Sequence, residues 1–337
     1  MKTLIAGVVA VLLSAALSGC TTSTSEPMQP VVSNAPAPRP TPAVVTPAVA
    51  VPTAPAAAFG GDCSVVATEA EISDATGGPS VLLLPSPADA GYADWAIRGL
   101  GGIRCTWSNE RSDGVWVTVV PVATAGQDII DDVSLGQPYC YGACSFSTTV
   151  GDWWYAGVVS TPDDSGIDPM VAIDDLVAAF GARAAANDAV APTRIDGTWD
   201  DVPECEILGE RVDTTALLGS DLEPTPGNVP GEAGPGFYGS LRAADYSACF
   251  WEGDGTMAEI GLLPGAWWAV DEQAALPGAV AVDVPGAVRA VLVPGADDFE
   301  TDTLYVTDGV NLATASGGYG TDQLGALAVA VMAGVAD

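Results

Sequence analysis

Two stretches of this 337-residue chain match each other around their cysteines, and this internal repeat limits the possible folds more than any other feature. The first stretch runs from Cys63 to Cys105-Thr-Trp107, and the second runs from Cys205 to Cys249-Phe-Trp251. The two Cys-to-Cys spacings are nearly equal, and in both stretches an arginine precedes the second cysteine by the same interval. The pattern predicts two tandem modules of one design.

The cysteines also predict the covalent framework. Of the seven cysteines, Cys20 falls in an N-terminal leader, and an even number remains. An even number is typical of disulfides in an exported protein, and the repeat narrows the choice of partners. Cys140 and Cys144 have no counterpart in the second stretch and would close a small local loop. We predict the disulfides Cys63–Cys105, Cys140–Cys144 and Cys205–Cys249.

Both stretches continue with the same series of elements. Apolar strands separated by turns that contain Gly and Asp predict a hairpin over 105–121 and another over 247–263. Asp168-Pro169 is a typical helix start and predicts a helix that ends the first module, and an Ala- and Val-rich helix from Thr321 ends the second. The predicted fold class is α+β, with two homologous modules that are each an antiparallel sheet with helices on one side, stapled by disulfides.

The N-terminus predicts export and a lipid anchor. Lys2 precedes an apolar run from Leu4 to Leu17, which is the layout of a secretory signal peptide and is too short for a stable membrane span. The run closes with Leu17-Ser-Gly-Cys20, which resembles the lipobox of bacterial lipoproteins, in which the cysteine is lipidated and becomes the first mature residue. The alternative is an ordinary signal peptide that happens to end at a cysteine.

The segment from Thr21 to Ala58 differs in composition from the rest of the chain. It is rich in Pro, Ala, Thr, Ser and Val, and only Glu26 and Arg39 are charged. Such a segment has too little to bury and favours extended polyproline II conformations. The predicted organisation is therefore a leader (1–20), a disordered stalk (21–58), the first module (59–190), a linker (191–203) and the second module (204–337).

The lipobox, the stalk and the Cys…Cys-x-Trp modules together resemble exported lipoproteins of high-GC Gram-positive bacteria, and a chain whose only lysine is Lys2 fits that source. The resemblance implies anchoring at the extracytoplasmic face of the cell membrane through acylated Cys20. Domains of this kind are mostly without an assigned role, and related ones are described as sensors or ligand-binding modules. The resemblance supplies no catalytic residues.

Composition excludes several functions. The chain has 43 acidic and 10 basic residues, a formal net charge of −33, and no histidine. Without histidine there is no Ser-His-Asp or Cys-His catalysis and no imidazole ligand for a metal. So negative a protein would repel a phosphate backbone, which excludes nucleic acid as a partner. We predict no cofactor and no metal site, with the acid-rich loops around 163–168 and 297–302 more consistent with solvated loops than with Ca²⁺ ligands.

The two matched arginines, Arg98 and Arg242, are the first candidate binding residues. In a chain with so few bases, a guanidinium beside the Cys-x-Trp strand could hold a carboxylate ligand bidentately. The alternative is an ion pair with one of the protein's own acids. Trp107 and Trp251, by contrast, follow disulfide cysteines and are expected in the core.

Two tryptophan doublets are the other candidates, namely Trp153-Trp154 and Trp267-Trp268. Adjacent residues on a strand point to opposite faces, so one Trp of each doublet could reach the surface, while burial beneath the terminal helix is the alternative for the other. An exposed Trp can stack on a sugar ring or anchor a protein interface.

The predicted function is recognition at the cell envelope without catalysis, with the membrane as partner through the anchor and an envelope protein or wall component as the second partner. One alternative is a small-ligand-binding or sensor lipoprotein with its site between the modules. Another is a hydrolase of wall polysaccharide that uses two carboxylates.

Overall fold

The computed structural model describes residues 53–84, 91–109, 114–162, 165–227, 234–253, 255–295 and 301–336. The predicted leader with Cys20, and the predicted stalk as far as residue 52, lie outside the described residues. Residues Val51–Asp337 form one unit.

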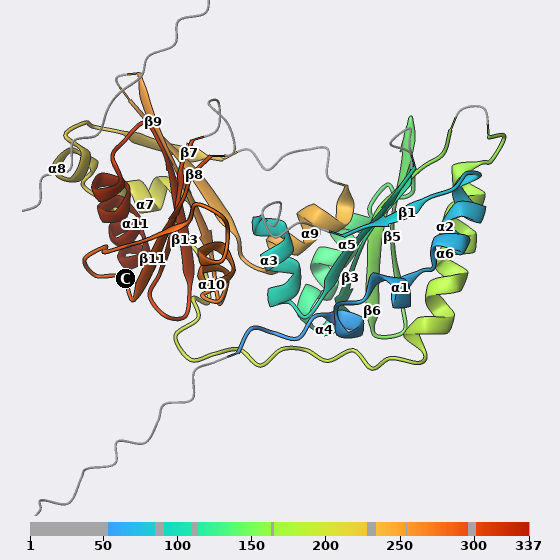
Figure 1. Ribbon diagram of the computed structural model, residues 1–337. Coiled ribbons are helices and arrows are strands. Elements are labelled where there is room, and N and C mark those ends of the chain that lie inside the picture. Colours follow the sequence, from blue (N-terminus) through green and yellow to red (C-terminus); the bar gives the residue numbers. More distant parts are fainter. Residues whose placement is uncertain are drawn as a thin grey trace, which may run out of the picture. The chain divides into compact units, whose positions relative to one another are not determined.

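Two antiparallel sheets form the framework (Figure 1). The first has the strand order β1-β2-β3-β6-β5-β4, and the second has the order β10-β11-β12-β13-β9-β8-β7. The first sheet comprises β1 (Val81–Leu83), β2 (Ile103–Ser108), β3 (Gly114–Pro121), β4 (Tyr139–Tyr141), β5 (Ala143–Val150) and β6 (Trp153–Ser160). The second comprises β7 (Glu223–Pro226), β8 (Ser247–Gly253), β9 (Thr256–Leu263), β10 (Val280–Val282), β11 (Arg289–Val293), β12 (Thr303–Thr307) and β13 (Leu312–Gly317).

The two sheets repeat one topology. Read from β7, the second sheet has the order of the first with one additional strand, β10, at its far edge. The registers match as well, since Cys105 lies opposite Val117 in the first sheet and Cys249 lies opposite Ile260 in the second. The predicted α+β class with antiparallel sheets is therefore confirmed.

All three predicted disulfides are present. In each half a bridge ties the first helix to the second strand, Cys63 to Cys105 and Cys205 to Cys249. Trp107 and Trp251 are fully buried in the same clusters as these cysteines, as predicted. The helices on this side are α1 (Cys63–Val66), α2 (Glu69–Thr76), α7 (Cys205–Arg211) and α8 (Thr214–Leu218).

A long helix closes the same face of each sheet. α6 (Pro169–Ala184) begins at Asp168, whose side chain accepts a hydrogen bond from the Met170 amide at 2.9 Å, and buries Phe180 against the first sheet. α11 (Thr321–Ala336) buries Leu327 and its neighbours against the second. Both helices begin at the predicted residues.

The opposite face of each sheet carries a second helical layer, which the prediction of helices on one side did not include. The layer contains α3 (Tyr92–Gly99), α4 (Val122–Ala125), α5 (Gln127–Ser134), α9 (Pro235–Ala243) and α10 (Ala269–Ala274). Its two central helices, α3 and α9, occupy the same place in the repeat, just before β2 and β8, and they contact each other.

These two helices reach across to the opposite half, although α3 also contacts β2 and β3 of its own sheet. α9 belongs to the second half by sequence but lies on β3, β5 and β6 of the first sheet. α3 belongs to the first half, yet the Tyr92 ring lies on Gly261 of β9, its hydroxyl hydrogen-bonds Thr314 of β13, and Trp95 meets the ring of Tyr305 of β12 edge-on. The sheets therefore share their helices across the repeat.

Complementary side-chain volumes specify the exchange. Aligning the two helices on Arg98 and Arg242 makes Trp95 the counterpart of Gly239. Gly239 lies directly under the Trp154 ring of the first sheet, whereas Trp95 packs in one cluster with Leu312, the second-sheet counterpart of Trp154. At the first sheet a small helix residue, Gly239, thus meets a large strand residue, Trp154. At the second sheet the large Trp95 of the helix is matched with the smaller Leu312 of the strand. The unexchanged pairing would bring two indoles together at one sheet and leave a void at the other.

One ion pair locks the helices on the disulfide side. Arg183 of α6 donates a hydrogen bond to Glu71 of α2, which also caps the Thr68 amide. The hydrogen bond from Arg183 holds the pKa of Glu71 at about 2, below its ordinary value of 4.5.

We therefore expect Glu71→Gln to lower the free energy of unfolding by less than about 1 kcal/mol at pH 6, since both side chains are partly exposed. Because the folded-state pKa is depressed, this contribution is present above pH 4.5 and is lost as the pH falls towards about 2. Urea titrations at several pH values would measure it, and a difference between variant and parent that is independent of pH would contradict the assignment.

Gly239→Ala tests the close contact of α9 with the first sheet. Alanine normally favours a helix interior over glycine by about 1 kcal/mol. Here the added methyl group would overlap the Trp154 ring, so we expect a net loss of about 1–3 kcal/mol in the free energy of unfolding.

The matched control is Gly99→Ala in α3, where an added Cβ meets nothing within 4 Å. This change should be neutral or stabilising. Equal effects of the two substitutions in thermal unfolding would show that α9 does not lie against Trp154.

Candidate functional site

Arg98 pairs with an acid of the other half. It projects from α3, its Nη1 lies 2.7 Å from Glu272 Oε1 in α10, and its guanidinium lies 4.3 Å from the centre of the Trp268 ring. The ion pair and the ring contact together hold the guanidinium in place.

Arg242 makes the equivalent contact in the opposite direction. It projects from α9 and forms an ion pair with Asp132 of α5, the element that occupies the place of α10 in the first half. Both partners are more than half exposed, in contrast to the Arg98 pair. Both arginines thus form ion pairs with the protein's own acids, which is the second of the two alternatives given above. Each ion pair links a central helix, α3 or α9, to the helix beside it.

Every arginine among the described residues bonds to another group of the protein, in most cases a carboxylate. Arg104 and Asp94 form a bidentate pair, Arg211 donates to the Gly334 carbonyl at the end of α11, and Arg289 pairs with Asp271. Arg194 lies 3.1 Å from Asp200 and donates to the Trp199 carbonyl. Trp199, in the predicted linker, is itself buried in the second core.

The expectation that one Trp of each doublet reaches the surface is wrong for Trp153 and Trp154, whose exposed fractions are 3% and 0%. The indole nitrogens donate to the Asn187 carbonyl and to Ser147 Oγ respectively. Alternation along β6 does place the two rings on opposite faces, but helices cover both faces. Trp154 lies under α9 and Trp153 stacks on Phe59 at 4.8 Å.

The second doublet differs from the expectation too. Trp267 and Trp268 lie in the turn before α10 rather than on a strand. Trp268 is buried beneath Arg98, and Trp267 is half-buried with its indole nitrogen enclosed. Of the acid-rich loops, Asp163, Asp164, Asp297, Asp298 and Glu300 lie outside the described residues, while Asp168 caps α6 and Asp302 accepts the Gly295 amide at 3.2 Å.

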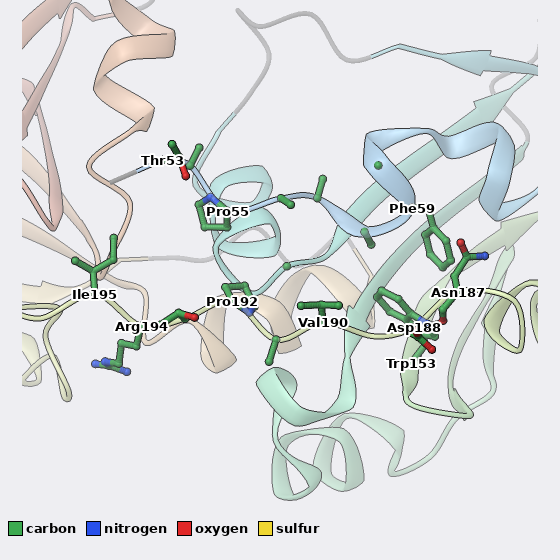
Figure 2. A pocket seen from close by; sticks show the side chains of 18 of the residues that line it. Thr53, Pro55, Phe59, Trp153, Asn187, Asp188, Val190, Pro192, Arg194 and Ile195 are labelled. Carbon is green, nitrogen blue, oxygen red and sulfur yellow. Dashed lines mark hydrogen bonds between the residues drawn. The ribbon is translucent and has the colours of Figure 1, made fainter. Parts of the chain in front are cut away.

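A groove of about 810 Å³ lies between two segments, 53–60 and 187–196. Figure 2 shows Phe59, Trp153 and Asn187 together at one end and Arg194 with Ile195 at the other. Small apolar residues and prolines line most of its length. The groove offers apolar contact but few polar side chains to orient a ligand.

A smaller cavity of about 430 Å³ lies on the first sheet beside the start of α9. Trp116 of β3, Arg104 of β2 and Phe237 of α9 line it, together with Val158 and Ser160 of β6. The alternation of side chains along β3 indicates the position of Trp116. Val115 and Val117 face the disulfide side of the sheet, so Trp116 between them must face the opposite side. The sequence analysis did not single out Trp116 or Arg104.

The positive charge of Arg104 at this cavity is balanced by an ion pair. Arg104 Nε lies 2.9 Å from Asp94 Oδ1, and its Nη2 donates to Asp94 Oδ2 at 3.0 Å. Burial raises the pKa of Asp94 above its usual range, and the Arg104 charge opposes that rise. The cavity therefore combines an aromatic ring, apolar walls and an ion pair with no net charge.

No metal-ligand set appears in the described parts of the chain, where no three Cys, Asp or Glu side chains come together. Among the described helices, none has the length and hydropathy needed to cross a bilayer. No family model, curated protein sequence or solved structure matches this chain.

We expect Arg98→Gln to lower the free energy of unfolding by about 1 kcal/mol, because Arg98 covers Trp268 and binds a partly shielded carboxylate. Arg242→Gln should cost less than about 0.5 kcal/mol, because its ion pair is exposed. Chemical denaturation measures both, with Arg98→Lys as the variant that retains the charge. Equal costs for the two Gln variants would contradict the different environments of these arginines.

Proposed function

We propose that this protein is a lipid-anchored lipoprotein of the extracytoplasmic cell envelope that binds a partner or wall component without catalysing a reaction. The observation that carries the proposal is the set of three disulfides, which form and persist in oxidising compartments. The Leu17-to-Cys20 motif supplies the anchor, and two acyl chains give stable attachment without a transmembrane helix.

Binding is favoured over catalysis by how the charged groups are used. The arginines of the described residues are engaged within the protein, and histidine is absent from the sequence. Arg104 lines the first-sheet cavity, and both carboxylate oxygens of its partner Asp94 bind the Arg104 guanidinium. A polysaccharide hydrolase, which needs one free carboxylate and one acid, is therefore the weaker candidate.

A small-ligand sensor with its site between the modules is also the weaker candidate. The space between the sheets contains α3 and α9, whose side chains form two apolar clusters with both halves. The cavity at that junction measures only about 280 Å³.

The anchor is tested by Cys20→Ala expressed in a bacterium that processes lipoproteins. We expect the parent chain in the detergent phase of a phase-separation experiment, with diacylglyceryl mass on its N-terminal residue, and the variant in the aqueous phase or unprocessed. Cys140→Ala/Cys144→Ala, which removes two cysteines without touching the motif, should remain in the detergent phase. A parent chain that partitions into the aqueous phase would contradict the proposed anchor.

A further inference from the structure

Trp116 stands apart from the other tryptophans of the chain. All nine lie within the described residues, and eight of them belong to or pack against one of the four apolar clusters. Trp116 belongs to none and is half-buried in the middle of β3, between Thr106 and Val158 of the neighbouring strands. A large aromatic ring that contributes to no core cluster and borders a cavity is available for a ligand.

The two halves differ in how the start of the central helix meets the sheet beside the cavity. Gly236 at the start of α9 is the counterpart of Tyr92 in α3 by the same alignment on Arg98 and Arg242. In the second half the Tyr92 ring lies on the sheet and its hydroxyl binds Thr314, so that volume is filled. In the first half Gly236 has no side chain, so the start of α9 lies directly on Thr118 and the Ala156 carbonyl, and the cavity lies beside this close contact, next to Trp116.

The charge of the cavity limits what it can bind. The Arg104–Asp94 pair has no net charge, and a free anion would also meet the field of a chain with a formal charge of −33. Asp94 cannot attract a cation strongly while its two oxygens bind Arg104. What remains is a planar array of hydrogen-bond donors and acceptors beside an indole ring, which suits a neutral ligand with hydroxyl groups and an apolar ring face.

We propose that the cavity lined by Trp116, Arg104 and Phe237 binds a neutral saccharide, with Trp116 stacked on the sugar ring and Arg104, its charge balanced by Asp94, hydrogen-bonded to the hydroxyl groups. This deepens the proposed function and rests on it for the source of the ligand, a polysaccharide of the envelope. The binding itself is a property of the cavity and does not require the anchor.

The test is isothermal titration calorimetry with the mature chain purified in detergent. The probes are tetrasaccharides of N-acetylglucosamine, arabinose and mannose, with oligogalacturonate of the same length as the anionic comparison. We expect saturable binding of at least one neutral probe and none of the oligogalacturonate. Trp116→Ala should weaken that binding at least tenfold, and Trp116→Phe should retain most of it.

Two further variants separate the site from a general surface effect. Tyr141→Ala removes an aromatic ring that is 87% exposed on β4 of the same sheet and should leave the affinity unchanged. Asp94→Asn leaves Arg104 without its counter-charge, so it should weaken the neutral probe and introduce binding of the oligogalacturonate. Circular dichroism of each variant establishes that it is folded.

Absence of binding by every neutral probe, or full affinity in folded Trp116→Ala, would overturn this proposal and leave the lipid anchor untouched. Binding of the oligogalacturonate alone by the parent chain would overturn it as well. Saccharide binding by a protein that fails the phase-separation experiment would support the site and refute the proposed location.

Discussion

The packing of α3 and α9 on each other's sheets is the interaction on which the rest of the structure depends. Both central helices pack on the sheet of the other half, α3 in addition to its own β2 and β3, so part of the free energy of burying those faces is available only when both halves fold together. The pairing is specified by volume, with Gly239 under Trp154 and Trp95 over the smaller Leu312. A repeat with identical halves could not encode such a choice. The divergence of the two copies at these positions makes the exchange specific.

The two halves also differ at the candidate site. In the second half the Tyr92 ring lies on the sheet, whereas in the first half Gly236 lies directly on Thr118, and Trp116 lines the cavity beside it together with Arg104, the partner of Asp94. A chain with so few bases uses its described arginines to hold its own elements together, so recognition here depends on an aromatic ring and a neutral ion pair rather than on free charge.

The sequence was sufficient for the features that depend on local spacing. The cysteine repeat predicted the three disulfides, and Asp168-Pro169 predicted the start of α6. The sequence was insufficient for features that depend on which surfaces pack together. The apolar pattern of a helix shows which side of it is buried, but not which of two similar sheets it packs on. Trp153 and Trp154 were misjudged for this reason. The nearly continuous apolar run of β6 was the available signal, because strands buried on both faces lose their polar alternation.

Hydrogen exchange measured by mass spectrometry on Gly239→Ala tests the exchange of helices most directly. The substitution lies in the second half of the sequence, but Gly239 lies on Trp154 of the first sheet. The account predicts faster amide exchange in β3 and β6, with β12 and β13 less affected, because local stability falls where packing is lost. Faster exchange confined to the second sheet, with β3 and β6 unchanged, would show that α9 covers its own half and would contradict the account.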